Sequence, residues 1–106
     1  MKKKISEITS CPIANTLDLI TGRWTFSIVY ILMQEGKKRF NELEKIIGGI
    51  NTRMLVRDLK KLEKNGMLTR TVFPTVPPTV EYELTEKGLA LKDIMIGTRD
   101  WGKKYL

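Results

Sequence analysis

Histidine is absent from this 106-residue chain, and cysteine occurs once, at Cys11. One cysteine cannot form an intramolecular disulfide, and zinc sites are built mainly from several Cys and His ligands, so neither is expected to hold the fold. The chain also shows no nucleophile–base pair and no phosphate-binding loop of the kind that indicates catalysis. We therefore expect a protein that is not an enzyme and that has no cofactor or metal.

Long hydrophobic runs are missing as well. The longest, Ile28–Met33, is far shorter than the roughly 20 residues that cross a bilayer. The basic start at Lys2–Lys4 is followed by polar residues where a secretory signal would have an apolar stretch. With 42% hydrophobic and 29% charged residues, the composition is that of a globular protein. We expect a single domain over residues 1–106, located in the cytoplasm and without a membrane partner.

Acidic residues are too few to balance the basic ones, and the formal net charge is +7. The excess is uneven, because residues 37–66 carry nine Lys or Arg against four Asp or Glu. Phosphate binding needs cations on one surface, so this concentration indicates a nucleic acid partner more strongly than the total charge does. A solvated basic face is the alternative that charge alone leaves open.

The segment 51–65 arranges these cations on one side of an expected helix. At 3.6 residues per turn, Leu55, Leu59 and Leu62 stack along one face. Such a helix can rest its leucines on a core and present its other side to a polyanion. The opposite face carries four cations, namely Arg53, Arg57, Lys60 and Lys64.

The segments before this helix also have helical spacing. Apolar residues predict helices over 13–21 and 24–34, and a third from about residue 41. Two glycines then form a tight turn, and the side chain of Asn51 can cap the basic helix. A short glycine-containing turn before a basic second helix predicts a helix-turn-helix at about residues 40–65. Ordinary helical hairpins share this pattern.

Two strand-like runs follow at once. Residues 67–73 are rich in β-formers, and residues 79–84 alternate, so that Tyr82 would point inward while Glu81 and Glu83 point to solvent. The prolines between them belong in a loop, since proline cannot donate ladder hydrogen bonds. A helix-turn-helix followed by such a hairpin, the wing, at about 67–84 predicts a mainly α (α+β) winged helix-turn-helix fold that binds double-stranded DNA.

A last helix is expected after Thr85, which can cap it. It has one apolar stripe through Leu91, Ile94, Trp101 and Tyr105, and the start of a second. One stripe can cover the domain's own core. The surplus indicates another surface to bury, most simply on a second copy of the chain.

Four segments together resemble the HxlR-type transcriptional regulators, bacterial winged-helix proteins akin to the MarR group. The segments are Cys11–Pro12, Leu17–Trp24, Arg39–Leu43 and Pro77–Gly88. The resemblance implies a homodimeric repressor or activator on palindromic operators, often beside genes of oxidative, aldehyde or quinone stress. It also implies that the first and last helices make the dimer contact. The residues expected there are Leu17, Ile20, Leu91, Ile94, Met95, Trp101 and Tyr105.

The basic helix is expected to enter the major groove. Its N-terminal part would read base edges, since arginine suits guanine and valine or a threonine methyl suits the thymine methyl. Its later lysines, and Arg39, would bind phosphates, which gives affinity without sequence information. The expected DNA-binding residues are Arg39, Asn51, Thr52, Arg53, Val56, Arg57, Lys60, Lys61, Lys64, Arg70 and Thr79.

The wing departs from the family pattern. Related proteins often carry a basic residue where this chain has Thr79, and the tip over residues 75–78 has no cation. Arg70 is the only positive charge in the hairpin. We therefore expect the wing to contribute less to DNA binding than the basic helix does.

Cys11 is a candidate sensor of oxidants or electrophiles. The nearby lysines at 2–4 would lower a thiol pKa and so favour the reactive thiolate. A buried cysteine that acts as a small apolar residue is the other interpretation. The effector, whether electrophile or other small molecule, stays open, as does the alternative of a winged helix used for protein contacts, which the basic face disfavours.

Overall fold

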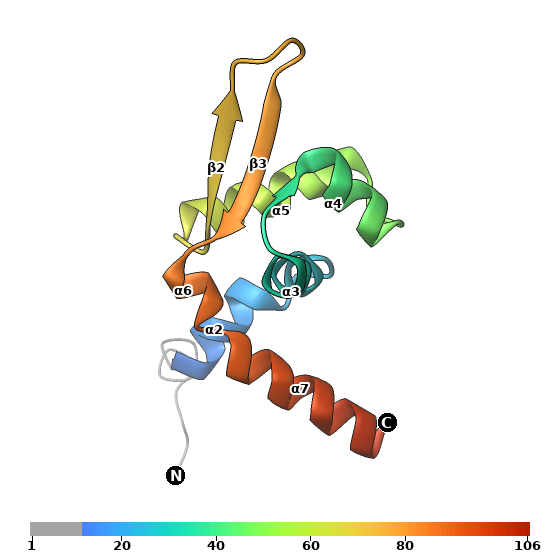
Figure 1. The fold of residues 1–106 in the computed structure, drawn as a ribbon. Helices are drawn as coiled ribbons and strands as arrows, with labels where there is room; N and C mark the ends of the chain where they lie inside the picture. The colour runs from blue at the N-terminus through green and yellow to red at the C-terminus, as the bar shows by residue number, and fades with distance from the viewer. Residues whose placement is uncertain (1–11) are drawn as a thin grey trace.

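The computed structural model describes residues 12–106 and has the winged helix-turn-helix architecture that the sequence predicts (Figure 1). The β2–β3 hairpin and helix α7 project from opposite ends of the helical body, and the molecule measures 62 × 32 × 26 Å. In chain order the elements are α2 (Pro12–Ile20), α3 (Thr25–Glu35), β1 (Lys38–Arg39), α4 (Phe40–Ile47), α5 (Thr52–Lys64), β2 (Leu68–Phe73), β3 (Thr79–Leu84), α6 (Glu86–Leu89) and α7 (Lys92–Tyr105).

The helix boundaries follow the local signals in the sequence. The Oδ1 atom of Asn51 accepts a hydrogen bond from the Met54 amide at 2.9 Å, so Asn51 caps α5 as predicted. Gly36 (φ 80°) and Gly48 (φ 69°) end α3 and α4 in conformations that favour glycine. At the start of α4 the Arg39 amide donates to Glu42 Oε1 at 2.8 Å, one half of a capping box.

The sheet contains a strand that the sequence analysis missed. Its order is β1-β3-β2, with both pairings antiparallel. β1 spans two residues only, and Lys38 pairs with Tyr82 across the ladder. So short a strand has no alternation to detect, and only the pairing with β3 defines it. β1 ties the start of the helix-turn-helix to the base of the wing.

The single C-terminal helix that the sequence predicts is two helices in the structure. Thr85 caps the short α6, whose Gly88 amide donates to Thr85 Oγ1 at 3.2 Å. The chain then turns through Ala90 and Leu91, where the Leu91 amide bonds to Gly88 O instead of the next carbonyl back. Leu91 is buried, so the turn places it in the core and sends α7 away in a new direction.

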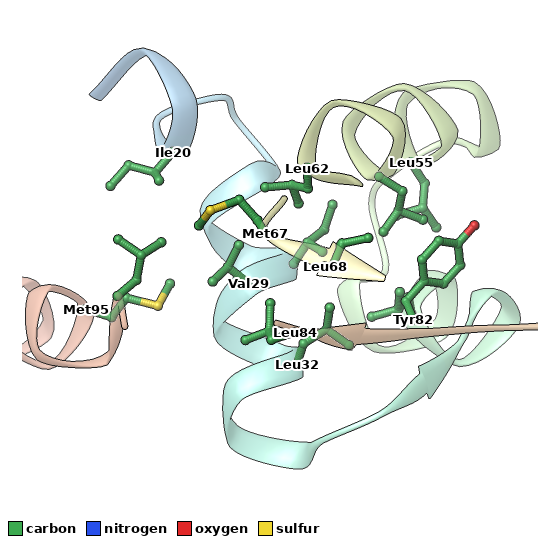
Figure 2. Packing of buried hydrophobic residues seen from close by; sticks show 14 residues of the cluster. Ile20, Val29, Leu32, Leu55, Leu62, Met67, Leu68, Tyr82, Leu84 and Met95 are labelled. Atoms are coloured by element: carbon green, nitrogen blue, oxygen red, sulfur yellow. The ribbon is translucent and has the colours of Figure 1, made fainter. Parts of the chain in front are cut away.

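The core lies where α3, α5, the sheet and the start of α7 meet (Figure 2). The leucine stripe predicted for α5 is confirmed, since Leu55, Leu59 and Leu62 are all at most 2% exposed. Helix α3 runs through the middle and is apolar on most sides, as its composition predicts. Met67 and Met95 close the cluster on the side of α2 and α7.

Candidate nucleic-acid interface

Helix α5 turns one side to the core and the other to solvent. Because Leu55, Leu59 and Leu62 anchor it, the opposite side is held outward with little freedom to rotate. Asn51, Thr52 and the four cations of the predicted stripe are exposed there. These cations, the basic face of α5, are Arg53, Arg57, Lys60 and Lys64.

Three of the four cations have no competing partner. Among residues 12–106, Arg53, Lys60 and Lys64 form no ion pair. Arg57 differs, because its Nε atom lies 3.2 Å from Asp58 Oδ1. Its side chain stays 67% exposed, so the pair is weak and leaves its other donors available. Three of the four cations of the face are therefore held without a neutralising acid.

Asp58 is a residue that the sequence analysis overlooked. It lies on the leucine side of α5 and is 5% exposed, with Oδ2 lacking a hydrogen-bond partner in the described part of the chain. A signal was present, since position 58 lies directly beside position 62, at the edge of the leucine stripe on the helical wheel. The carboxylate draws Arg57 toward the edge of the basic face, so Arg57 and Arg53 are not equivalent.

Thr52 is exposed, but its hydroxyl is hydrogen-bonded to another residue of the protein. Its hydroxyl donates to Glu44 Oε2 at 2.7 Å and so links α5 to α4 across the turn. The methyl group and the oxygen lone pairs remain for other contacts. Val56 is half-buried and lies on the side of α5 that faces the wing. Both residues therefore lie in the N-terminal half of α5, Thr52 exposed and Val56 half-buried.

Lys61 lies apart from the basic face. Its Nζ atom donates to the backbone carbonyl of Asp18 at 3.0 Å, and its side chain is half-buried. Position 61 falls well to one side of Arg53 and Lys64 on the helical wheel. Lys61 thus connects α5 to the end of α2, where the carbonyls of a helix C-terminus favour a cation.

Arg39 is exposed at the junction of β1 and α4, and its partner is Glu81. The shortest nitrogen–oxygen distances to the Glu81 carboxylate are 3.9 Å from Arg39 and 3.8 Å from Lys37. The prediction that Glu81 points to solvent is wrong, because its side chain is only 20% exposed and lies between these cations. Cross-strand pairing of Arg39 with Glu81 brings the charges together. Glu83, by contrast, is exposed as predicted.

The wing carries few groups suited to phosphate. Arg70 is exposed, and Thr79 is half-buried with its hydroxyl 2.8 Å from that of Thr75. Thr75 in turn donates to the Pro77 carbonyl at 2.7 Å, so these hydroxyls order the tip. Val76 at the tip is 99% exposed. The surface of the wing end is thus apolar and uncharged.

The residues expected at the dimer contact divide into two groups. Ile20, Leu91 and Met95 are buried in the chain's own core, which leaves little of their surface for a partner. Their helices turn these side chains inward, where they close the core beneath α2 and α7. Leu17, Ile94, Trp101 and Tyr105 are each at least 48% exposed, and the rings of Trp101 and Tyr105 lie 5.3 Å apart.

Helix α7 contacts α3 through Arg99 on α7 and Tyr30 on α3. The Tyr30 hydroxyl accepts a hydrogen bond from Gln34 Nε2 at 3.0 Å and neighbours Arg99 on α7. The bond from Gln34, and then the guanidinium of Arg99, lower the pKa of Tyr30. These contacts connect α7 to α3, and none of their residues belongs to the basic face of α5.

Cys11 lies outside the described residues. Over residues 12–106, none of the helices is both long and apolar enough to span a membrane.

Comparison with known proteins identifies the family. Residues 19–106 match the family described as HxlR-like helix-turn-helix. The chain is 44% identical to the HTH-type transcriptional regulator YdeP of Bacillus subtilis (strain 168), over 93% of this chain and 77% of YdeP. It is also 45% identical to YybR, another HTH-type transcriptional regulator of that strain, over 88% of this chain and 74% of YybR.

Solved structures of regulators resemble this chain in fold and in sequence. The oxidized form of the redox regulator HypR superimposes with a TM-score of 0.80 and 44% identity, covering 91% of this chain and 98% of HypR. The reduced form of the transcriptional regulator YodB from B. subtilis gives 0.78 and 38%, covering 90% of this chain and 93% of YodB. YodB treated with diamide gives 0.73 and 35%, covering 90% and 94%. The chain therefore belongs to the HxlR-like helix-turn-helix family of transcriptional regulators.

Proposed function

We propose that this regulator binds a specific palindromic sequence of double-stranded DNA as a homodimer and acts as a repressor. The observation that carries the proposal is the basic face of α5, which is exposed and on which Arg53, Lys60 and Lys64 form no ion pair among the described residues. Arg53 near its N-terminus has the best placement for base edges, while Lys60 and Lys64 further along suit phosphates. Arg39 and Arg70 would add backbone contacts at the wing side.

Four residues have revised roles in this proposal. Thr52 contributes its methyl group and lone pairs, because its proton is held by Glu44. Lys61 serves to hold α5 against α2, and a phosphate contact would require it to leave the Asp18 carbonyl. Asn51 and Thr79 contribute mainly by fixing the start of α5 and the tip of the wing. The recognition surface is therefore narrower than the full set of cations in the sequence.

Selection of bound sequences from a random pool of DNA duplexes tests the proposal. An inverted repeat with half-site centres about 34–36 Å apart, or a multiple of that, is expected for a twofold dimer. Affinity for the selected site should fall steeply with salt, since each neutralised phosphate contributes about −0.9 to the slope of log K against log salt. Enrichment of no sequence, with binding that salt does not weaken, would contradict DNA recognition.

Replacing Arg53 with alanine is expected to weaken operator binding by about 1–3 kcal/mol and to relax specificity at one base pair. The reason is loss of a bidentate contact from an arginine that no acid neutralises. Lys64→Ala is the matched comparison, because it removes one charge from the same face. That variant should weaken all operator variants alike. If Arg53→Ala also caused a uniform loss, Arg53 would be a phosphate contact.

The homodimer would form through α2 and α7. Ile13 and Leu17 on α2, with Ile94 and Trp101 on α7, are exposed apolar side chains at one end of the molecule. Large exposed apolar side chains in such a group are typical of an interaction surface. The aromatic pair at the end of α7 extends this surface beyond the body of the protomer, as a reciprocal contact between two copies requires.

Regulation through Cys11 is the second part of the proposal, supported by the similarity to HypR, a redox regulator solved in oxidized and reduced forms, and to diamide-treated YodB. Diamide, which oxidises thiols, is expected to weaken operator binding by the wild-type protein and to leave Cys11→Ser unaffected. Fluorescence anisotropy with the selected operator measures both. Reversal by a thiol reductant is the control. Equal responses of the two proteins would show that Cys11 is structural.

A further inference from the structure

Helix α7 is attached to the rest of the protomer along a short stretch near its start. Met95 is its one buried residue, Ile96 and Gly102 are half-buried, and the remaining residues of the helix are exposed. Figure 1 shows α7 leaving the helical body, with the C-terminus at its far end. A single apolar anchor at Met95 would let the helix pivot, so other contacts must fix the direction in which α7 points.

Arg99 makes such a contact. It lies one helical turn after Met95 on the same side of α7, and its guanidinium group neighbours the Tyr30 hydroxyl on α3. The hydroxyl also accepts a hydrogen bond from Gln34 Nε2 at 3.0 Å. The Nε and Nη2 atoms of Arg99 lie 3.2 and 3.1 Å from Asp100 Oδ1. Tyr30 and Arg99, the α3–α7 clasp, are thus each held by a second side chain.

The ring of Tyr30 gives the clasp a rigid base. It is half-buried against the core, and a tyrosine has only two side-chain torsions, so the hydroxyl is held in place relative to α3. Asp100 first and Tyr30 second raise the pKa of Arg99. The Arg99 side chain remains 41% exposed. The clasp therefore lies at the surface and can be removed without opening the core.

The clasp and the proposed dimer contact lie on different sides of α7. At 100° per residue, Arg99 is about 200° around the helix from Trp101 and about 140° from Ile94. Changes at the clasp therefore leave the exposed apolar surface of α7 intact. Along the axis, Arg99 lies about 6 Å from Met95 and Tyr105 lies about 15 Å from it. A displacement at the clasp is therefore enlarged about 2.5-fold at the end of the helix.

We propose that Tyr30 is a positioning residue: by holding Arg99 it fixes the direction of α7 and thereby the separation of the two α5 helices in a dimer. The direction of α7 concerns one protomer, whereas the separation rests on the proposed homodimer and operator binding. In a twofold dimer built on α7, the direction of this helix places both protomers, so any change in it acts twice. The accepted half-site spacing would thus be set on α3, away from the proposed DNA-binding residues.

The first test measures the direction of α7 in the absence of DNA. Spin labels at Lys45→Cys on α4 and Lys104→Cys on α7, both exposed positions, are introduced into the full-length protein with Cys11→Ser. Double electron–electron resonance then measures the distance between them. Dilution with unlabelled protein restricts the signal to one protomer, and repetition with Trp101→Glu removes support of α7 by a partner. One narrow distance is expected while the clasp is intact.

Tyr30→Phe is expected to shift or broaden this distance by about 2 Å or more, since about 1 Å of freedom at Arg99 is enlarged to that extent at position 104. Arg99→Gln should have the same effect. Arg99→Lys keeps a cation that can donate to the Tyr30 hydroxyl, so it should keep most of the wild-type distance. Lys92→Gln is the matched control, because it removes the same charge from the same side of α7.

Two results of this test would overturn the proposal. One is an unchanged distance in both Tyr30→Phe and Arg99→Gln. The other is an equal change in Lys92→Gln, because the effect would then arise from charge alone. Tyr30→Phe keeps the ring, so its circular dichroism should match that of the wild type. Arg99→Gln alters an exposed side chain and provides an independent variant if Tyr30→Phe does not fold.

A second measurement tests the consequence for DNA. One base pair inserted at the centre of the selected inverted repeat moves the half-sites apart by about 3.4 Å and rotates them by about 35°. The wild type is expected to lose about 100-fold or more in affinity, the scale of a lost second half-site. Tyr30→Phe should lose at most about 10-fold, because a freed α7 can follow the displaced half-site. It should bind the unaltered operator about 3–10-fold more weakly, since the freed helix must be ordered on binding.

The spacing profile separates positioning from a merely structural role. A structural role predicts the same relative weakening at every spacing, so equal relative losses for the two proteins would overturn the proposal. Absence of any selected operator would count against the proposed DNA binding, and a monomeric wild type would count against the proposed homodimer. The spin-label distances would still decide whether the clasp directs α7.

Discussion

Replacing Gly88 with alanine is expected to destabilise the protein by about 2–3 kcal/mol, the cost of severe overpacking. A Cβ atom at this position would lie 2.2 Å from the Met67 carbonyl oxygen and 3.0 Å from Leu84 Cδ2. The carbonyl cannot move freely, because it accepts a hydrogen bond from the Thr85 amide at 3.0 Å. Relief of the clash would therefore separate α6 from the base of the wing.

Thermal and urea unfolding at one fixed protein concentration measure this effect. For a domain of this size the melting temperature should fall by about 10–20 °C. Gly97→Ala is the matched control, since a Cβ atom there meets nothing within 4 Å and the position is helical. That variant should be neutral or more stable by up to about 1 kcal/mol. Equal stability of the two variants would mean that α6 does not pack on Met67 as described.

Replacing Trp101 with glutamate is expected to convert the protein to a monomer and to weaken operator binding by about 10²–10⁴-fold. Trp101 is 58% exposed in the protomer, so the proposed partner surface loses a large apolar side chain and gains a charge. In a dimer, binding of one protomer to its half-site holds the second protomer at a high effective concentration beside the other half-site. A monomer loses this advantage, so the effect on DNA binding is large.

Sedimentation velocity and anisotropy with the selected operator measure the two effects. Circular dichroism should show the wild-type helix content, since Trp101 lies outside the core. Lys92→Gln is the control, because it makes the same change in net charge on the opposite side of α7. It should remain dimeric. A dimeric Trp101→Glu protein with normal operator affinity would place the dimer contact on another surface.

Local periodicity was sufficient to predict most elements. The leucine stripe of α5, its Asn51 cap and the alternation of β3 each depend on residues within a few positions of one another. Such signals are read from sequence because the backbone geometry of a helix or strand is local. The basic face followed directly, since the cations of α5 must point away from a face that is buried. The class of function, a transcriptional regulator with a helix-turn-helix fold, could therefore be predicted from the sequence.

Other features required contacts between distant segments. The turn at Leu91 separates α6 from α7 because Leu91 enters the core. Helical periodicity in the sequence does not predict this break. The charge stripe could not show that Asp18 holds Lys61 or that Glu44 holds Thr52. The apolar stripe of the C-terminal segment likewise mixed buried Met95 with exposed Trp101. Each distinction depends on which neighbour the fold brings near.

Sequence alone therefore determined the winged helix-turn-helix order and the basic face of α5, because amphipathic patterns and caps specify elements and their inner sides. Tertiary structure decided which cations are free and which apolar residues remain exposed for a partner. The physical reason is that burial and pairing are set by segments far apart in the chain, whose relative positions the local pattern does not encode.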